Sequence, residues 1–446
     1  MRKTDLAKGT LFLIFFWIGG HAPVIAQRAQ PAQRAQGTQE TQRAQPEGTS
    51  FEELARMALT RNADLQAARE SVHQAEARLT QARLWPNPSV ELSKKTDAPF
   101  ANEGDRGYGV TVSEPLELGG KRGKRTNLAK ASIEVARADV AEAERQLTGR
   151  LRLLFFEAQG IAVRVDLLEQ LDRANSQMAG VMNVRVRAGD ASQLDFQLLQ
   201  AQTNQVRAER LVTQNQLAGL VVQIRTIAGL SADEPLVVKA GQGAVEMTDT
   251  EEAAVARALQ NRPDLKASRL REELAEAGIS VARSQAIPDV TAFARYAQES
   301  LLGPSPGATQ TRSFARENVL EFGVSVPLPI FNREQGNVSE AASRRVQARA
   351  ERESLEAAVR RDVALAFHRY ETARTSVEIL RSGVLAPNEA SVRMVQLSYN
   401  LGELRFLDIV NQQRVLIDAE TMFASAQIEL NTARAELETA IGSPPD

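Results

Sequence analysis

This 446-residue chain has no cysteine and only three histidines, the residue types that supply thiolate nucleophiles and imidazole metal ligands. The sequence contains no cysteine, which excludes disulfide bonds, thiolate metal sites and a lipid-modified N-terminal cysteine. Of its three histidines, His21 lies in a leader, and His73 and His368 each stand alone in a helical pattern. A lone histidine on a helix is usually solvated or packed, and the sequence has no nucleophile elbow or dinucleotide fingerprint. We therefore expect no catalytic residue, no cofactor and no metal site.

A basic run is the densest cluster of charge, formed by Lys121, Arg122, Lys124 and Arg125 around Gly123. The run lacks the spacing and the terminal Ser or Thr of a phosphate-binding P-loop. We interpret it as a basic segment at a membrane interface that faces anionic headgroups. Charge is otherwise balanced, with 54 Lys+Arg against 56 Asp+Glu, and this composition argues against a nucleic-acid partner.

Two glycine–acid pairs interrupt long helical patterns, Gly189-Asp190 and Gly402-Glu403. A glycine that ends one helix just before the next begins is a common signal for a tight interhelical turn. The segments around the pairs match each other, RAGDASQLD at 187–195 with NLGELRFLD at 400–408. We expect two tight turns between paired long helices, and these turns are the first candidates for a functional site.

This match is part of an internal duplication of the chain. RNADLQAAR at 61–69 matches NRPDLKASR at 261–269, and the two turn segments lie farther apart in the sequence than these two do. We assign the difference to a longer loop at 298–316 in the second repeat. A typical domain has about 150 residues, so the length alone would suggest three domains. The duplication indicates two repeats instead. Their predicted bounds are 50–230 and 250–443, with a linker at 231–249.

The N-terminal residues 1–26 have the pattern of a secretory signal peptide. A basic end precedes the apolar run LFLIFFWI at 11–18, and Val24 and Ala26 offer small residues before a cleavage site. The apolar run is far shorter than the ~20 residues that a membrane-spanning helix needs. Residues 27–49 repeat the tetrad QRAQ, which predicts a disordered low-complexity leader.

Each repeat shows the same order of elements: helices, a strand, a loop, a strand, a very long helix, a turn and a last helix. Helical and period-two patterns predict their bounds. In the first repeat these are helices 51–60, 63–84 and 124–187 and strands 89–95 and 107–114. In the second they include strands 289–297 and 320–326 and a long helix over 334–399. Apolar heptads along both long helices indicate coiled-coil packing, and Pro387 should kink or break the second.

The four strands pose a topological problem. The strands have the length and the alternating faces of membrane-barrel strands, but four strands are too few to close a barrel. An open sheet edge is not tolerated in lipid. Either the sheet is soluble and packs on helices, or several chains share one barrel. Two chains would supply 8 strands and three would supply 12, and periodicity alone does not choose between these arrangements.

After residue 50 the sequence resembles the outer-membrane efflux protein family, the TolC-like outer-membrane factors. Three motifs resemble its cobalt–zinc–cadmium resistance branch: LWPNP at 84–88, ELGGKR at 117–122 and PLPIFNR at 327–333. The resemblance implies a mainly α-helical homotrimer, in which four strands per chain form a 12-stranded transmembrane barrel joined to a long coiled-coil periplasmic tunnel. It implies a place in the outer membrane of a Gram-negative bacterium, with most of the chain in the periplasm.

The resemblance further implies a passive export duct without enzymatic activity. The implied partners are outer-membrane lipid, a periplasmic adaptor (membrane fusion) protein and an inner-membrane RND-type pump, which together form a tripartite system. The branch suggests divalent heavy-metal cations as cargo, with drugs or other small molecules as an alternative. A second alternative is a soluble periplasmic coiled-coil scaffold or adaptor. Adaptor docking would fall on the tip turns, at Gly189, Asp190, Gly402 and Glu403.

A gate is also implied near these turns. Asp408 matches a tunnel-facing aspartate of the family's pore constriction, and Asn411 stands where the archetype has a second aspartate. Asp195 and Tyr399 match members of the network that holds the gate closed. The basic partner is displaced to Arg405, whose direction on the helix differs by ~100° from that of the usual position. Three Asp408 carboxylates in a narrow pore would attract cations, whereas the alternative is an exposed aspartate on a solvated helix face.

Overall fold

The computed structural model describes residues 49–96, 106–238, 250–304 and 312–442. The chain divides into two units, Met1–Pro46 and Glu47–Asp446, and every described residue belongs to the second. The predicted signal peptide lies outside the described residues, as do nearly all of the predicted leader and most of the predicted linker.

The first repeat begins with two capped helices. Ser50 Oγ accepts a hydrogen bond from Glu53 N at 3.2 Å, and Asn62 Oδ1 accepts one from Leu65 N at 2.9 Å, which fixes where each helix starts. Gly189 and Gly229, in the left-handed conformation, end the two long helices. The elements are α1 (Phe51–Arg61), α2 (Ala63–Ala82), β1 (Ser89–Thr96), β2 (Arg106–Leu116), α3 (Lys121–Ala188) and α4 (Gln193–Ala228).

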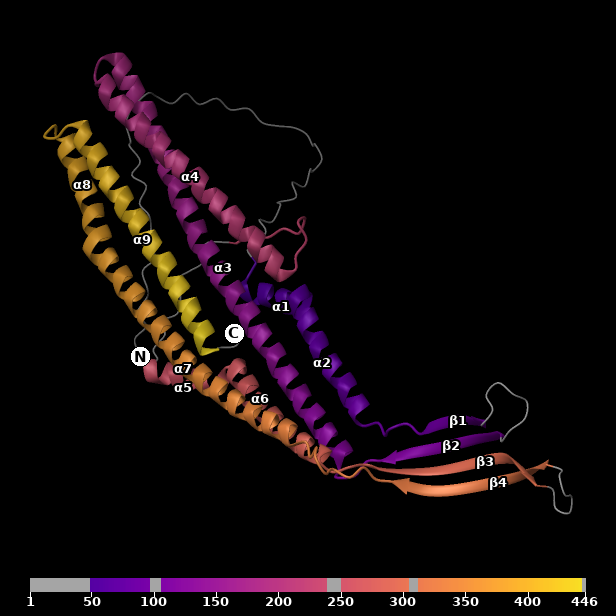
Figure 1. The fold of residues 1–446 in the computed structure, drawn as a ribbon. Coiled ribbons are helices and arrows are strands. Elements are labelled where there is room, and N and C mark those ends of the chain that lie inside the picture. The colour runs from indigo at the N-terminus through magenta and orange to yellow at the C-terminus, as the bar shows by residue number, and fades with distance from the viewer. Residues whose placement is uncertain (1–48, 97–105, 239–249, 305–311, 443–446) are drawn as a thin grey trace, which may run out of the picture. The chain divides into compact units, whose positions relative to one another are not determined.

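The second repeat follows the same order of elements (Figure 1), and it has one added turn within its long helix. Its elements are α5 (Glu251–Asn261), α6 (Pro263–Gln285), β3 (Val290–Pro304), β4 (Arg312–Ser325), α7 (Gln335–Leu380), a π-helical turn η1 (Arg381–Leu385), α8 (Ala386–Asn400) and α9 (Phe406–Ile441). The prediction of a loop over 298–316 was wrong. Strands β3 and β4 stay paired through most of this segment, from the pair Gln298–Asn318 to the pair Pro304–Arg312. Backbone pairing does not depend on side-chain polarity, and the sequence pattern loses its alternation before the ladder ends.

The four strands form one antiparallel sheet in the order β1-β2-β3-β4 (Figure 1). The central β2–β3 pair joins the two repeats, and β1 and β4 are its unpaired edges. The register aligns apolar residues into rows on one face, and the side chains in these rows are largely exposed. Two such rows are Val90, Val112, Ala294 and Phe322, and Leu92, Val110, Tyr296 and Leu320. The alternation predicted from sequence is confirmed.

Each repeat buries its own apolar cluster, where α1, α3 and α4 meet in the first and α5, α7 and α9 meet in the second. The predicted heptad stripes supply these cores. One constant offset in residue number relates equivalent core positions on α3 and α7, as in Leu151 and Val363 or Ala158 and Tyr370. For equivalent positions on α4 and α9 the offset is larger by one, as in Ile224 and Leu437.

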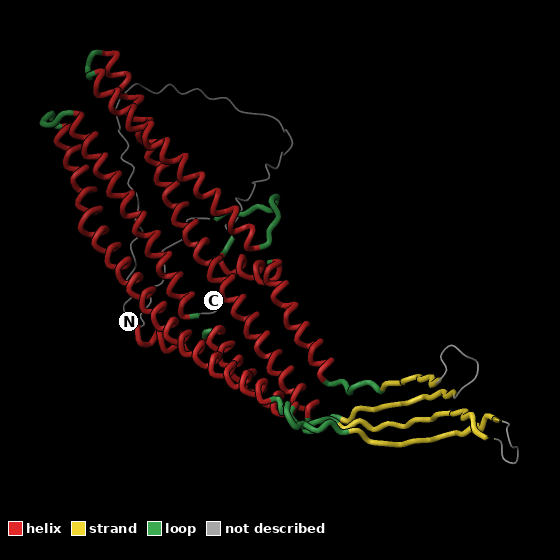
Figure 2. Tube along the Cα trace, viewed as in Figure 1, coloured by secondary structure: helices red, strands yellow, loops and turns green. Residues whose placement is uncertain are grey.

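The π-helical turn accounts for this change in offset. A π-helical turn accommodates one residue more than an α-helical path does, and η1 lies between α7 and α8 where the offset changes. Pro387 stands in the first turn of α8, so the predicted kink or break takes the form of a π turn just before the proline. Asn388 Nδ2 donates to Val384 O at 2.8 Å and satisfies a carbonyl of the turn. Figure 2 shows the helical path passing through this region without a loop.

Candidate functional site

The two predicted turns lie at the ends of the α3–α4 and α8–α9 hairpins (Figure 1). Gly189 has φ +82° and Gly402 has φ +79°, a left-handed conformation that favours glycine. The backbone N–H groups of Asp190 and Glu403 donate to Arg185 O and Ser398 O, each at 2.9 Å. This is the Schellman pattern, in which two backbone hydrogen bonds close a helix end. The two repeats therefore build the same turn from different residues.

The helices that leave these turns begin differently. Ser192 Oγ accepts from Leu194 N at 3.1 Å and starts α4, and Asp195 lies half-buried in its first turn. In α9 the carboxylate of Asp408 accepts from the backbone N of Arg405 at 2.9 Å. Asp408 is therefore a capping residue of its own helix, and this local role exists whether or not the residue also lines a pore.

A side-chain hydrogen bond joins the two hairpins near the turns. Arg185 Nη1, in the last turn of α3, donates to Tyr399 Oη, near the end of α8, at 2.5 Å. Sequence reasoning selected Tyr399 but missed Arg185. The sequence did carry a signal for Arg185. Arg185 lies about one helical turn before Gly189, much as Tyr399 lies about one turn before Gly402 in the other repeat.

The structure does not bring the other predicted gate residues together within one chain. Among the described residues, the side chains of Asp195 and Arg405 form no ion pair, and Arg405 contributes its backbone N–H to Asp408. Asn411 is exposed one turn after Asp408. It lies on a stripe of α9 with spacing 3, 4, 3, 4 that a facing helix or a pore could contact: Asp408, Asn411, Val415, Asp418 and Met422.

A carboxylate that the sequence analysis did not select, Glu420 on α9, is perturbed in the α8–α9 hairpin. Burial, together with the negative charge of Glu389 on α8, raises the pKa of Glu420 on α9 to about 7. The neighbouring contact is neutral, since Gln412 Nε2 donates to Asn388 Oδ1 at 3.3 Å. The Gln412–Asn388 hydrogen bond ties α8 to α9 just after the π-helical turn, whereas the charges of Glu389 and Glu420 repel each other. The α8–α9 hairpin thus holds an acid that titrates near neutral pH.

Two of the four cations in the basic run at the start of α3 are paired with carboxylates inside the chain. Lys121 Nζ lies 2.8 Å from Asp289 Oδ1, and the Arg125 guanidinium is paired with Glu117. The Arg122 guanidinium lies over the Trp85 ring, 4.6 Å from its centroid. These three contacts hold the strand–helix junction together. Lys121, Arg122 and Arg125 therefore have partners within the chain, and the interpretation of the run as a segment facing lipid headgroups stays a prediction.

The described residues contain no group of three or more His, Cys, Asp or Glu side chains placed to hold a metal ion. His73 lies 3.5 Å from Glu76 and His368 lies 3.6 Å from Glu251, so each histidine has a single acidic neighbour. Over the same ranges, no helix combines the length and the apolar character that crossing a membrane requires.

A mainly helical chain with two long hairpins, duplicated tip turns and one four-stranded sheet defines a class of outer-membrane channel. The chain belongs to the outer membrane efflux protein family, which matches residues 54–230 and 254–443. The predicted family, fold class, efflux role and outer-membrane location are therefore confirmed, and the alternative of a soluble scaffold is set aside.

Among its relatives, the chain is similar to proteins named for metal resistance. The chain is 26% identical to the cobalt-zinc-cadmium resistance protein CzcC of Cupriavidus metallidurans, over 88% of this chain and 90% of that protein. It is 24% identical to the nickel and cobalt resistance protein CnrC of the same organism, over 72% and 73% of the two chains. Two solved channels share its fold. CusC superposes with a TM-score of 0.71 at 17% identity, over 89% of this chain and 93% of that chain. The open state of MtrE from Neisseria gonorrhoeae superposes with a TM-score of 0.69 at 19% identity, over 88% of each chain.

Proposed function

We propose that the protein is the outer-membrane duct of a tripartite efflux system and works as a homotrimer. The observation that carries the proposal is the sheet: four strands, an exposed apolar face and two unpaired edges at β1 and β4. Unpaired edges are not stable in lipid, and three copies of the sheet joined edge to edge would give a closed 12-stranded barrel. The duct catalyses no reaction, and a periplasmic adaptor and an RND-type inner-membrane pump supply its cargo.

The cargo we propose is divalent heavy-metal cations. The support comes from relatives named for resistance to cobalt, zinc, cadmium and nickel, which align over most of this chain. A duct conducts its cargo without binding it tightly. A duct for drugs or other small molecules is the second candidate, because a duct conducts whatever its pump delivers.

The gate we propose lies at the tip turns. Asp408 would form a threefold carboxylate ring at the constriction, with Asn411 one turn along the pore. The Arg185–Tyr399 hydrogen bond would hold the two hairpins of one chain in the closed arrangement, with Asp195 and Arg405 available for contacts between chains. The exposed turns at Gly189-Asp190 and Gly402-Glu403 would dock the adaptor.

Deletion of the gene and complementation test this function. Loss of the protein should sensitise the cell to zinc, cobalt and cadmium salts, and the wild-type gene should restore growth. Purified protein should insert into planar bilayers as a trimer and form steady channels. Drug sensitivity without metal sensitivity would favour the second candidate, and failure to form channels would contradict the duct.

A further inference from the structure

The two faces of the sheet differ in charge in the part of the sheet that lies far from the helices. The register places the even-numbered residues of all four strands on the face that carries the apolar rows. On this face Lys94 and Arg316 are exposed, and the backbone register puts Arg106 in the same row as Arg316. Among the described strand residues, its one acid is Glu114, which lies near the helices. The opposite face carries the acids of the far part: Glu91, Glu299, Glu317 and Glu321.

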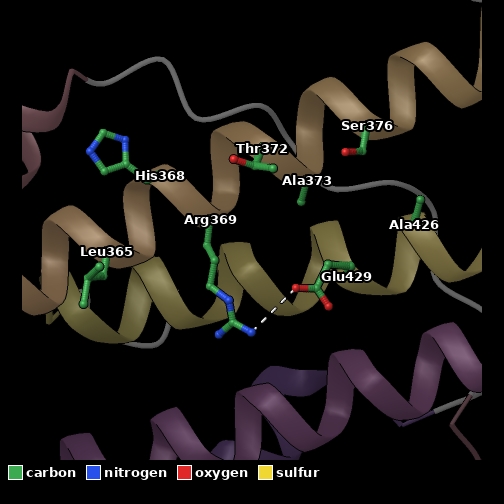
Figure 3. Close-up of a pocket in the computed structure, with 8 residues that line it drawn as sticks. All are labelled: Leu365, His368, Arg369, Thr372, Ala373, Ser376, Ala426 and Glu429. Carbon is green, nitrogen blue, oxygen red and sulfur yellow. Dashed lines mark ion pairs between the residues drawn. The ribbon is translucent and has the colours of Figure 1, made fainter.

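The cations of the two faces also differ in their partners. On the opposite face, Lys95 lies 3.6 Å from a glutamate of β3, and Arg295 lies 3.7 Å from a glutamate of β4. A similar pair lies in the open pocket between α7 and α9, where Arg369 is 3.7 Å from a glutamate of α9 (Figure 3). Within the described ranges, Lys94 and Arg316 have no acidic partner. The face with the apolar rows therefore carries cations that are free to bind an anion from outside the chain.

These cations lie directly beyond the apolar rows. Along β4, with increasing distance from the helices, the residues of this face are Phe322, Leu320, Asn318 and Arg316. Strand β1 changes from apolar to basic at the same level, because Lys94 is in register with Asn318 across the sheet. An apolar surface followed by a basic one matches a bilayer core followed by charged headgroups, which long basic side chains can reach.

We propose that Lys94, Arg106 and Arg316 form an outer basic surface that binds the phosphate groups of lipopolysaccharide, the phosphorylated glycolipid of the outer leaflet. The inference rests on the barrel of the proposed function. The helices then lie in the periplasm, and the far end of the sheet reaches the outer leaflet (Figure 1). Lysine and arginine donate charge-assisted hydrogen bonds to phosphate, and arginine can donate two in parallel.

The spacing of the cations favours a headgroup with more than one phosphate. Arg106 and Arg316 stand two strands apart in one row, which is about 10 Å of backbone separation. A disaccharide with two phosphates can contact cations on different strands at once, whereas a phospholipid headgroup offers one phosphate. In the closed barrel, β4 of one copy adjoins β1 of the next, so Arg316 and Lys94 of neighbouring copies flank each seam. We expect three equivalent sites in a trimer.

Lipid binding by the purified protein tests this surface. Full-length trimer is extracted in detergent, freed of bound lipid and titrated with lipid A, the phosphorylated anchor of lipopolysaccharide. Native mass spectrometry counts the lipid A molecules on each trimer and gives their Kd, and we expect up to three on the wild type. Lys94→Gln/Arg316→Gln should raise the Kd by about 10-fold or more, because two charge-assisted contacts are lost.

The matched control is Lys95→Gln/Arg295→Gln, which removes two cations from the opposite face and should bind lipid A as the wild type does. Equal affinity of the wild type and of Lys94→Gln/Arg316→Gln would overturn the proposal. Weaker binding by the control alone would overturn the assignment of faces, and equal weakening of both variants would assign the binding to overall charge. If Lys94→Gln/Arg316→Gln does not assemble, the two single variants replace it, and each should bind more weakly than the wild type.

Phosphatidylglycerol, an anionic lipid with one phosphate, is the second probe and should bind more weakly than lipid A. Equally tight binding of both lipids would overturn the assignment to the glycolipid. Trimers that form channels in planar bilayers but bind no lipid A would overturn this inference and leave the proposed function standing. A wild-type protein that is neither trimeric nor channel-forming would overturn the proposed function itself.

Discussion

At the scale of single residues, Asp408 combines two roles that different substitutions can separate. Its carboxylate caps α9, and its charge is the proposed source of cation attraction in the pore. Asp408→Asn keeps an oxygen that can cap and removes the charge, whereas Asp408→Ala removes both and should also cost ~1 kcal/mol of stability. We expect both variants to lose block by multivalent cations in planar bilayers.

The control for this prediction is Asp190→Asn, which removes an exposed carboxylate at the other tip turn. Unchanged cation block in Asp408→Asn would show that Asp408 only caps its helix. Equal loss in both variants would assign the block to the general negative charge of the tips.

The hydrogen bond from Arg185 to Tyr399 is the second single-residue feature, and we expect it to stabilise the closed channel. Tyr399→Phe removes the acceptor and keeps the ring, so the variant should fold normally. A single hydrogen bond contributes about 0.5–1.5 kcal/mol, which corresponds to about a 2- to 10-fold shift towards the open channel. Single-channel recording should show longer or more frequent open states. Arg185→Lys/Tyr399→Phe should add little to Tyr399→Phe, and full additivity would contradict a shared contact.

The acid pair in the α8–α9 hairpin makes stability depend on pH. The folded-state pKa of Glu420, about 7, lies above its ordinary value of 4.5, so the proton is bound more tightly in the folded protein. Its contribution is therefore fully present below about pH 4.5 and is lost as pH rises through 7. Relative to Glu420→Gln, the wild type should be similarly stable at pH 5 and less stable at pH 8. The difference should be about 2 kcal/mol once partial solvent screening is allowed for.

Thermal unfolding of both proteins at the two pH values measures this difference. Asp418→Asn, an exposed carboxylate on the same helix, is the matched control and should follow the wild type at both values. The prediction is contradicted if the difference in stability between the wild type and Glu420→Gln is the same at pH 5 and pH 8. That result would show that the Glu420 carboxylate is solvated.

At the scale of elements, the glycines of α3 distinguish a packed helix face from a free one. Gly160→Ala would place a Cβ against Ile428 and force α9 away, at a cost of about 1–3 kcal/mol. Gly180→Ala meets nothing within 4 Å and should stabilise the helix by about 0.5–1 kcal/mol. Denaturant unfolding of the two variants should move in opposite directions. A shift in the same direction would show that α3 and α9 do not pack at Gly160.

The elements were predicted best where their signals are local. The tip turns, the strands of the first repeat and the long helices of both repeats lie within a few residues of their predicted positions. Capping residues, glycines and period-two alternation act over short distances, which is why these elements can be predicted locally. The later part of the β3–β4 pairing was missed because polar and apolar residues no longer alternate there, as at Leu301 and Leu302. The π turn was expected as a kink or break at Pro387, since the extra residue becomes visible only when both repeats are aligned in space.

At the scale of the whole molecule, the exposed apolar face of the sheet is the feature that requires a membrane and further copies. Phe322→Arg would place a charge on this face, where burial in lipid costs about 2–4 kcal/mol. We expect less trimer in the outer-membrane fraction. Ser325→Arg, on the opposite face of the same strand, should leave the yield unchanged. Equal yields from both variants would contradict the lipid-facing assignment.

The sequence by itself determined the duplication, the order of elements, the tip turns and the family, because periodicity, glycine positions and motifs are properties of the chain read in order. Only the tertiary structure decided which side chains meet. Arg185 and Tyr399 are 214 residues apart, and Lys121 and Asp289 are 168 apart. The charge of Glu389 on α8 acts on Glu420 of α9. Such pairs depend on the rotation and register of packed helices, where a shift of one residue turns a side chain by about 100°.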